Sequence, residues 1–337
     1  MPIERRRFLT TGAAAIAAAA AIRPRIVRAA AAPKFGTVSV RFNWTMKGEF
    51  TPFVVAREKG FYRDAGIDVQ LNPGTSGTVA VQSVAGGHDH FGYLPSVQLI
   101  EGITKQQMPV KAVAECGSAT GMCWASRPDV PLTGPKSLEG RRVSISPAST
   151  FFQVWNSFAK EFNIDQSKVQ VIGADPSARV GLFMDGRVDI MADIFFANDY
   201  VILQAKMPQH KLNLFRLSDA KTQFDPLGYV LAARDELIQK EPAMVKAFTG
   251  ATLRGLAYTY DHPDEAAELM IKAPENQLAP DIVRGQVHNL LALINVKPVV
   301  GKNEPADWSR SLKILQNAGV IERALDHASY YTNAFVS

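Results

Sequence analysis

Hydrophobic and polar positions alternate along this 337-residue chain in short blocks that predict strands and helices in turn. "VSVRF" (38–42) alternates as a strand does, and "TPFVVAREK" (51–59) predicts a helix with Thr51 as N-cap and Gly60 in the left-handed turn after it. "IDVQL" (67–71) predicts the next strand and leads into the glycine-rich loop "NPGTSGT". Strands that alternate with helices in this way predict an α/β sheet.

The same pattern begins again after the proline-rich stretch 127–140. "RRVSISP" (141–147) and "VQVIG" (169–173) predict strands, and "FFQVWNSFAKEF" (151–162) predicts a helix with one aromatic stripe. A later strand, "GYVLAAR" (228–234), precedes a mostly helical remainder. Prolines suit the first position of a helix, so three of them predict helix starts: Pro242, Pro263 and Pro280. The chain therefore predicts two α/β lobes.

The first 32 residues differ from the rest. An arginine cluster in "RRRFLT" precedes a short alanine-rich apolar run and small residues, which is typical of an export signal and resembles a twin-arginine leader. We expect cleavage near residues 30–32. No cysteine follows the apolar run, so we predict an exported protein without a lipid anchor.

Composition supports a folded protein, with 47% hydrophobic and 20% charged residues. The formal net charge of +5 comes from the first 30 residues, which hold six arginines and one glutamate. The remainder is formally neutral, so charge gives no reason to predict a nucleic-acid partner.

No motif for catalysis, phosphate binding or metal binding stands out. We interpret "HDH" (88–90) as surface or rim histidines, because neighbouring strand residues point to opposite faces. Cys116 and Cys123, the only cysteines, leave a disulfide and two free thiols both open. We predict no catalytic residue, no metal and no cofactor.

Aromatic residues follow several predicted strands, where open α/β sheets place ligand-contacting loops: Trp44, Tyr93, Phe195 and Phe196. The loops "GTSGT" and "SPAST" also place small hydroxyl residues before helices. Such helix starts can hold a polar ligand edge, or the hydroxyls can simply cap the helix.

The chain resembles the periplasmic substrate-binding proteins of ABC transporters, in the branch that joins thiamine-pyrimidine-precursor binders with sulfonate, nitrate and taurine binders. The resemblance rests on "FVVAREKGFYRDAGIDVQL", "PGTSGTVAVQSVAGG", "HFGYL", "LEGRRVSISPAST" and "DGRVDIMAD". It implies a two-lobed type II clamshell with a two-crossover hinge. Lobe 1 would comprise residues 33–125 and 231–337, and lobe 2 residues 126–230.

The resemblance also implies a ligand site between the lobes. The residues that match it are Asn43, Trp44, Glu49, Phe50, Ser76, Gly77, Thr78, Tyr93, Ser149, Thr150, Asp193, Phe195 and Tyr229. His90 departs from the family pattern, which often has aspartate there.

The candidate residues are richer in aromatic and acidic side chains than in arginine, which favours a planar heterocycle such as a thiamine pyrimidine precursor. Arg179 could instead serve a sulfonate, taurine or nitrate ligand. We predict a non-enzymatic, monomeric periplasmic protein that delivers its ligand to a membrane permease and ATPase. A pyrimidine-synthase-like enzyme and a sensory domain of the same fold are the alternatives.

Overall fold

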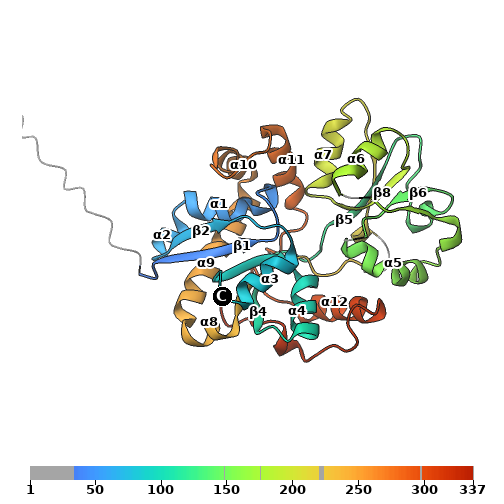
Figure 1. The fold of residues 1–337 in the computed structure, drawn as a ribbon. Coiled ribbons are helices and arrows are strands. Elements are labelled where there is room, and N and C mark those ends of the chain that lie inside the picture. Colours follow the sequence, from blue (N-terminus) through green and yellow to red (C-terminus); the bar gives the residue numbers. More distant parts are fainter. Residues whose placement is uncertain (1–33, 148, 175, 220–223, 297, 337) are drawn as a thin grey trace, which may run out of the picture. The chain divides into compact units, whose positions relative to one another are not determined.

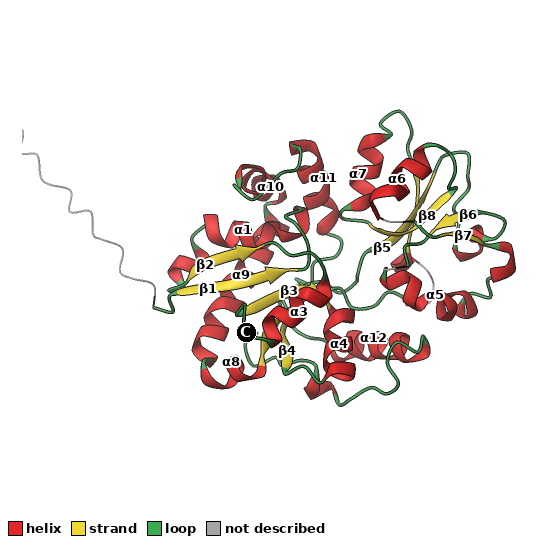
Figure 2. Cartoon of the chain, viewed as in Figure 1, coloured by secondary structure: helices red, strands yellow, loops and turns green. Residues whose placement is uncertain are grey.

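The computed structural model describes residues 34–147, 149–174, 176–219, 224–296 and 298–336. The expected leader, residues 1–32, lies outside these ranges. The strands form two five-stranded mixed sheets, each accompanied by its own helices (Figures 1 and 2). The predicted fold class, a two-lobed α/β protein, is confirmed.

The first sheet has the strand order β2-β1-β3-β10-β4. β1 is parallel to β2 and β3, whereas β10 is antiparallel to both β3 and β4. Its strands are β1 (Thr37–Phe42), β2 (Asp68–Asn72), β3 (Phe91–Pro95), β4 (Val110–Glu115) and β10 (Tyr229–Arg234). β10 thus returns late in the chain to fill the place between β3 and β4.

The second sheet, of order β7-β6-β8-β5-β9, repeats this plan. β6 is parallel to β7 and β8, and β5 is antiparallel to β8 and β9. Its strands are β5 (Met122–Ser126), β6 (Arg142–Ser144), β7 (Gln170–Ile172), β8 (Ile190–Phe195) and β9 (Asn213–Arg216). Its helices are α5 (Thr150–Glu161), α6 (Pro176–Met184) and α7 (Asp199–Lys206), with 3₁₀ turns η2 (Pro135–Leu138), η3 (Gln166–Lys168) and η4 (Leu217–Asp219).

The other helices belong to the segments before β5 and after β10. They are α1 (Thr51–Glu58), α2 (Phe61–Asp64), α3 (Gly77–Ala85), α4 (Ser96–Gln106), α8 (Asp235–Lys240), α9 (Pro242–Asp261), α10 (Pro263–Lys272), α11 (Pro280–Leu290) and α12 (Pro305–Asn317), with 3₁₀ turns η1 (Gly48–Phe50) and η5 (His327–Ser329). The three predicted proline starts are confirmed, because α9, α10 and α11 begin at those prolines. No described helix combines the length and apolar character needed to cross a membrane.

Two segments, 116–121 and 217–228, carry the chain from one sheet to the other. They are hydrogen-bonded to each other, since Gly228 N–H donates to Gly117 O over 3.0 Å. A Cβ on Gly228 would lie 2.1 Å from Ala119 O, so this close approach requires glycine. From α12, Arg310 donates to Asp225 O (2.9 Å) and Ser118 O (3.0 Å), and so joins both crossovers. The lobe boundaries at residues 125 and 230 stay predictions.

The structure decides two local predictions, the N-cap of α1 and the state of the two cysteines. Thr51 is not the N-cap of α1; Phe50 occupies that position without a side-chain bond, and η1 leads directly into the helix. Cys116 and Cys123 are both buried free thiols; Cys116 begins the first crossover and Cys123 lies in β5, beyond its end.

Candidate functional site

Four polar side chains converge where β1 ends and β10 begins. Asn43 Nδ2 donates to the hydroxyl of Tyr229 (3.1 Å), and Lys47 Nζ lies 3.4 Å from the same oxygen. Lys47 also pairs with Glu49 Oε2 at 2.6 Å, and the two side chains are only 14% and 2% exposed. The loop after β1 therefore delivers a neutralised, buried ion pair beside an amide and a phenol.

An aromatic cluster supports this polar group from beneath. Tyr229 stacks on Tyr93, with ring centroids 5.0 Å apart, and Phe50 meets Tyr93 edge-on at 5.9 Å. Phe50 and Tyr93 are buried in the core of the first sheet. Their direct contact with a ligand stays a prediction; in this structure they position Tyr229.

A second polar group lies at the end of β8. Arg179, from α6, donates to Asp193 Oδ1 (2.7 Å) and to Asp199 Oδ1 (3.3 Å). The other oxygen of Asp193 accepts from Ser146 N–H (2.7 Å), and that of Asp199 accepts from Phe195 N–H (2.9 Å). One guanidinium thus fixes two carboxylates and the turn that follows β8.

The two polar groups, one from each sheet, lie close enough to affect each other electrostatically. Burial lowers the pKa of the Lys47 ammonium, but the carboxylates of Glu49 and Asp199 oppose it, and that pKa is raised above its usual value. Burial raises the pKa of Asp199, which Arg179 and Lys47 oppose. Burial and Glu49 raise the pKa of Tyr229 to about 12, so its hydroxyl stays protonated.

Sequence reasoning missed Lys47 and Asp199. Each follows a strand by only a few residues, as do the side chains that were predicted, and this position was the available signal. The sequence pattern favoured aromatic residues and loop hydroxyls, whereas the charged pairs of the structure come from the same segments after the strands.

The loop after β1 and the glycine-rich loop that packs on it contribute exposed and capping groups. Trp44 is 49% exposed, which excludes a core role, and its carbonyl accepts from Gly74 N–H (3.0 Å). Ser76 caps α3 by accepting from Val79 N–H (3.2 Å). Gly77 begins α3 and Thr78 follows it, with an exposed side chain. Ser76 therefore has a structural task whether or not a ligand binds nearby.

The matching loop before α5 behaves in the same way. Ser149 caps the helix by accepting from Phe152 N–H (3.1 Å), and Thr150 is its first residue. Ser146, the first residue of this loop, joins it to the Arg179 group by donating its N–H to Asp193 Oδ2 (2.7 Å). Contact of Ser149 and Thr150 with a ligand stays a prediction. Phe152 is exposed at 44% on the same turn.

The "HDH" segment is structural. Asp89 is buried and accepts from Arg41 Nε (2.8 Å), Asn72 Nδ2 (2.7 Å) and Ser83 Oγ (2.6 Å). His90 Nδ1 lies 3.2 Å from the backbone nitrogen of Ser39. Across the described ranges no group of three or more His, Cys, Asp or Glu residues is arranged to hold a metal ion.

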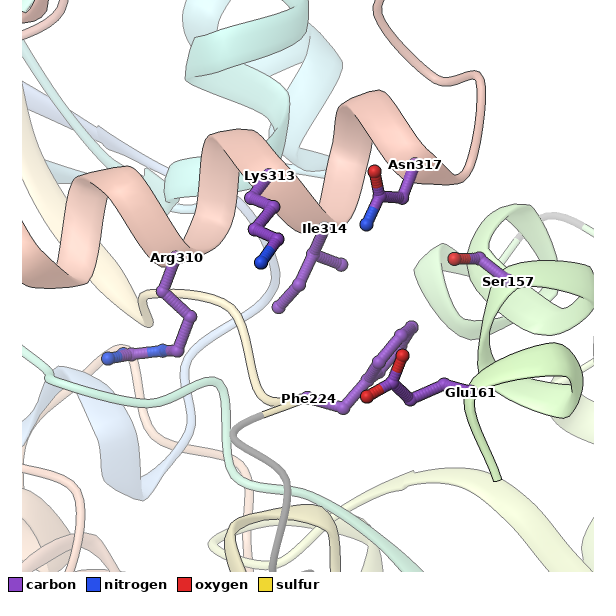
Figure 3. Close-up of a pocket in the computed structure, with 7 residues that line it drawn as sticks. All are labelled: Ser157, Glu161, Phe224, Arg310, Lys313, Ile314 and Asn317. Carbon is purple, nitrogen blue, oxygen red and sulfur yellow. The ribbon is translucent and has the colours of Figure 1, made fainter. Parts of the chain in front are cut away.

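A cavity of about 270 Å³ lies elsewhere, between α5 and α12 (Figure 3). Its lining residues are Ser157, Glu161, Phe224, Arg310, Lys313, Ile314 and Asn317. None of the predicted ligand residues lines it. It adjoins the crossover through Phe224 and Arg310, and we do not assign the ligand site to it.

The two sheets, their paired crossovers and the polar groups at the strand ends define a periplasmic-binding-protein fold. The aliphatic sulphonate-binding protein SsuA of Escherichia coli has the same fold, with a TM-score of 0.69 at 13% identity over 87% of this chain and 91% of that one. The family described as NMT1/THI5 like matches residues 47–266, and the chain belongs to this family.

Its curated relatives include binding proteins and an enzyme. Riboflavin-binding protein RibY of Chloroflexus aurantiacus is 25% identical over 91% of this chain and 88% of its own length. The formylaminopyrimidine-binding protein of Halalkalibacterium halodurans is 22% identical over 83% of this chain and 84% of its own. A 4-amino-5-hydroxymethyl-2-methylpyrimidine phosphate synthase of Legionella pneumophila is 30% identical, but over only 30% of this chain and 31% of its own. The relatives that match most of the chain are solute-binding proteins.

Proposed function

We propose that this protein is the solute-binding component of an ABC importer and that it captures a small, planar, uncharged heterocycle between its two lobes. A thiamine pyrimidine precursor or a flavin-like ring exemplifies the class. The relatives named for formylaminopyrimidine and riboflavin support a heterocyclic ligand. The observation that carries the proposal is that the two cations of the site, Lys47 and Arg179, are already paired with carboxylates.

Both site cations already have carboxylate partners. Lys47 is paired with Glu49, and Arg179 with Asp193 and Asp199. These groups carry two formal positive and three formal negative charges, so the site has no net positive charge to offer. A sulfonate or nitrate would have to enter a buried region without a free cation, which is electrostatically unfavourable. A neutral ring meets no such penalty.

Trp44 gives this ligand class a stacking surface, and its replacement tests that role. We expect Trp44→Ala to weaken binding of the best heterocycle about tenfold, equivalent to about 1.4 kcal/mol, because aromatic stacking is lost. Thermal stability should change little, since the ring is half-exposed. Trp44→Phe, which keeps a ring, is the matched control. Unchanged affinity in Trp44→Ala would show that the ring does not contact ligand.

The ligand class itself can be tested by a thermal-shift screen of residues 33–337. The panel contains aminopyrimidines, lumichrome, riboflavin, taurine, alkyl sulfonates and nitrate. A ligand that binds only the folded state at about a hundred times its dissociation constant adds about 2.7 kcal/mol to the stability, which raises the melting temperature measurably. We expect shifts with heterocycles alone. A shift only with sulfonates or nitrate would contradict the charge argument while leaving the fold intact.

The cellular setting follows from the same proposal. A periplasmic location and a permease and ATPase as partners are part of the proposal, and so is action as a monomer. The twin-arginine route of export stays a prediction from residues 1–32. Export dependent on the "RRRFLT" arginines, measured with Arg5 and Arg6 replaced by lysine, would support that route.

A further inference from the structure

The turn before α7 holds a buried amide group without a hydrogen-bond partner. Asn198 is only 6% exposed, and neither its Oδ1 nor its Nδ2 has a hydrogen-bond partner among the described residues. The same holds for Asn43 Oδ1 and for Gln286 Nε2. Roughly 90% or more of buried polar groups in proteins are hydrogen-bonded, so an unpaired buried amide indicates a missing partner.

Asn198 has the largest unused hydrogen-bonding capacity of these groups, because both atoms of its amide lack a partner. It occupies the N-cap of α7, a position where asparagine normally accepts a bond from the helix backbone, yet its side chain makes no such bond. The adjacent Asp199 is fully engaged by Arg179 and by Phe195 N–H. The Asn198 amide is therefore free for another task, with one donor and one acceptor side by side.

The turn that holds Asn198 is covered by a helix that follows the first sheet. Asn289 of α11 donates to Phe196 O over 3.0 Å. A Cβ on Gly285 of α11 would lie 2.7 Å from a methyl group of Val201 on α7. Separation of α7 from α11, by rotation at the crossovers, would uncover the turn. When α7 and α11 come together again, a ligand on this turn would be buried against the Asn198 amide.

We propose that Asn198 reads one edge of the ligand: Nδ2 donates to a ring nitrogen or carbonyl oxygen, and Oδ1 accepts from the neighbouring N–H. This inference rests on the proposed function and narrows it to heterocycles with an adjacent donor and acceptor, such as an imide or an aminopyrimidine. An aliphatic sulfonate presents no such edge.

The test compares wild type with Asn198→Leu and the smaller Asn198→Ala. Isothermal titration uses two probes, lumichrome and 4-amino-5-hydroxymethyl-2-methylpyrimidine. We expect both variants to bind the probe recognised by wild type at least tenfold more weakly. The melting temperature of unliganded Asn198→Leu should be equal or higher, because the unpaired buried amide is gone. The exposed Asn156 of α5 provides the control Asn156→Leu, which should change neither quantity.

Each outcome is decisive. Weaker binding together with undiminished stability supports a ligand-reading role, since a structural amide would lower the melting temperature when replaced. Wild-type affinity in both Asn198 variants would overturn this role and leave the proposed function standing. A fall in the melting temperature of both variants would show that the amide is paired within the protein. Failure of wild type to bind either probe, or any other heterocycle in the screen, would overturn the proposed function itself.

Discussion

Replacement of Arg179 with methionine is expected to lower the free energy of unfolding by about 3–5 kcal/mol, because it leaves the buried carboxylate of Asp193 without its cation. Asp193 is almost fully buried and would keep only the hydrogen bonds from neighbouring groups such as Ser146 N–H. Asp199, anchored by the same guanidinium, would also lose its ion pair. Heterocycle binding should weaken as well, because the turn after β8 loses its anchor.

Urea denaturation of purified protein measures this loss. Arg187→Met is the matched control, because Arg187 lies on the same stretch of chain, is exposed and should alter stability by less than about 0.5 kcal/mol. Adding Asp193→Asn to Arg179→Met should restore part of the stability, since the uncompensated buried charge is then removed. A loss below about 1 kcal/mol in the single variant would contradict the view that this ion pair is a buried structural element.

Stability should also depend on pH through Glu115, at the end of β4. Glu115 is fully buried; Oε1 accepts from Asn295 Nδ2 (2.9 Å) and Oε2 from Glu304 N–H (3.0 Å). Burial, followed by the nearby charge of Asp307, raises the pKa of Glu115 to about 8 despite the bond from Glu304. The ordinary pKa of a glutamate is 4.5. Between pH 4.5 and about 8, Glu115 is therefore protonated in the folded protein but ionised in the unfolded chain. The free energy of unfolding should therefore fall as pH rises through this window, by at most about 1.4 kcal/mol per pH unit.

Glu115→Gln removes this titration while keeping a neutral side chain of the same size. The variant should be less sensitive to pH than wild type, so that it gains stability relative to wild type between pH 5 and pH 9. Urea unfolding at pH 5, 7 and 9 measures the difference. Exposed Glu322→Gln is the control and should run parallel to wild type. Parallel curves for Glu115→Gln would show that Glu115 is ionised throughout the range.

Local signals predicted much of the fold, because they act over a few residues. Prolines at 242, 263 and 280 begin helices since they lack an N–H that the first turn does not need. Ser76 and Ser149 cap their helices as their hydroxyls suggest. Thr51 failed because η1 continues directly into α1 and leaves no free turn to cap.

The candidate site was less predictable, because its contacts join distant segments. Lys47 lies in the loop after β1, whereas Asp199 begins α7 beside the other sheet, and nothing local indicates that each affects the pKa of the other. Arg179 was recognised as a possible anion binder, yet its partners Asp193 and Asp199 neutralise it only once α6, β8 and α7 are assembled. Asn198 resembles an ordinary helix cap in sequence, and only the folded protein shows an unpaired amide there.

The position of β10 between β3 and β4 has a consequence for synthesis of the chain. A nascent polypeptide that ends before residue 229 exposes the edges of both neighbouring strands, which are surfaces prone to aggregation. All strands of the second sheet lie between residues 122 and 216, so that sheet can close as soon as they emerge. The middle of the polypeptide can thus fold before its beginning, and the amino-terminal strands need protection, by a chaperone or by rapid elongation, until β10 arrives.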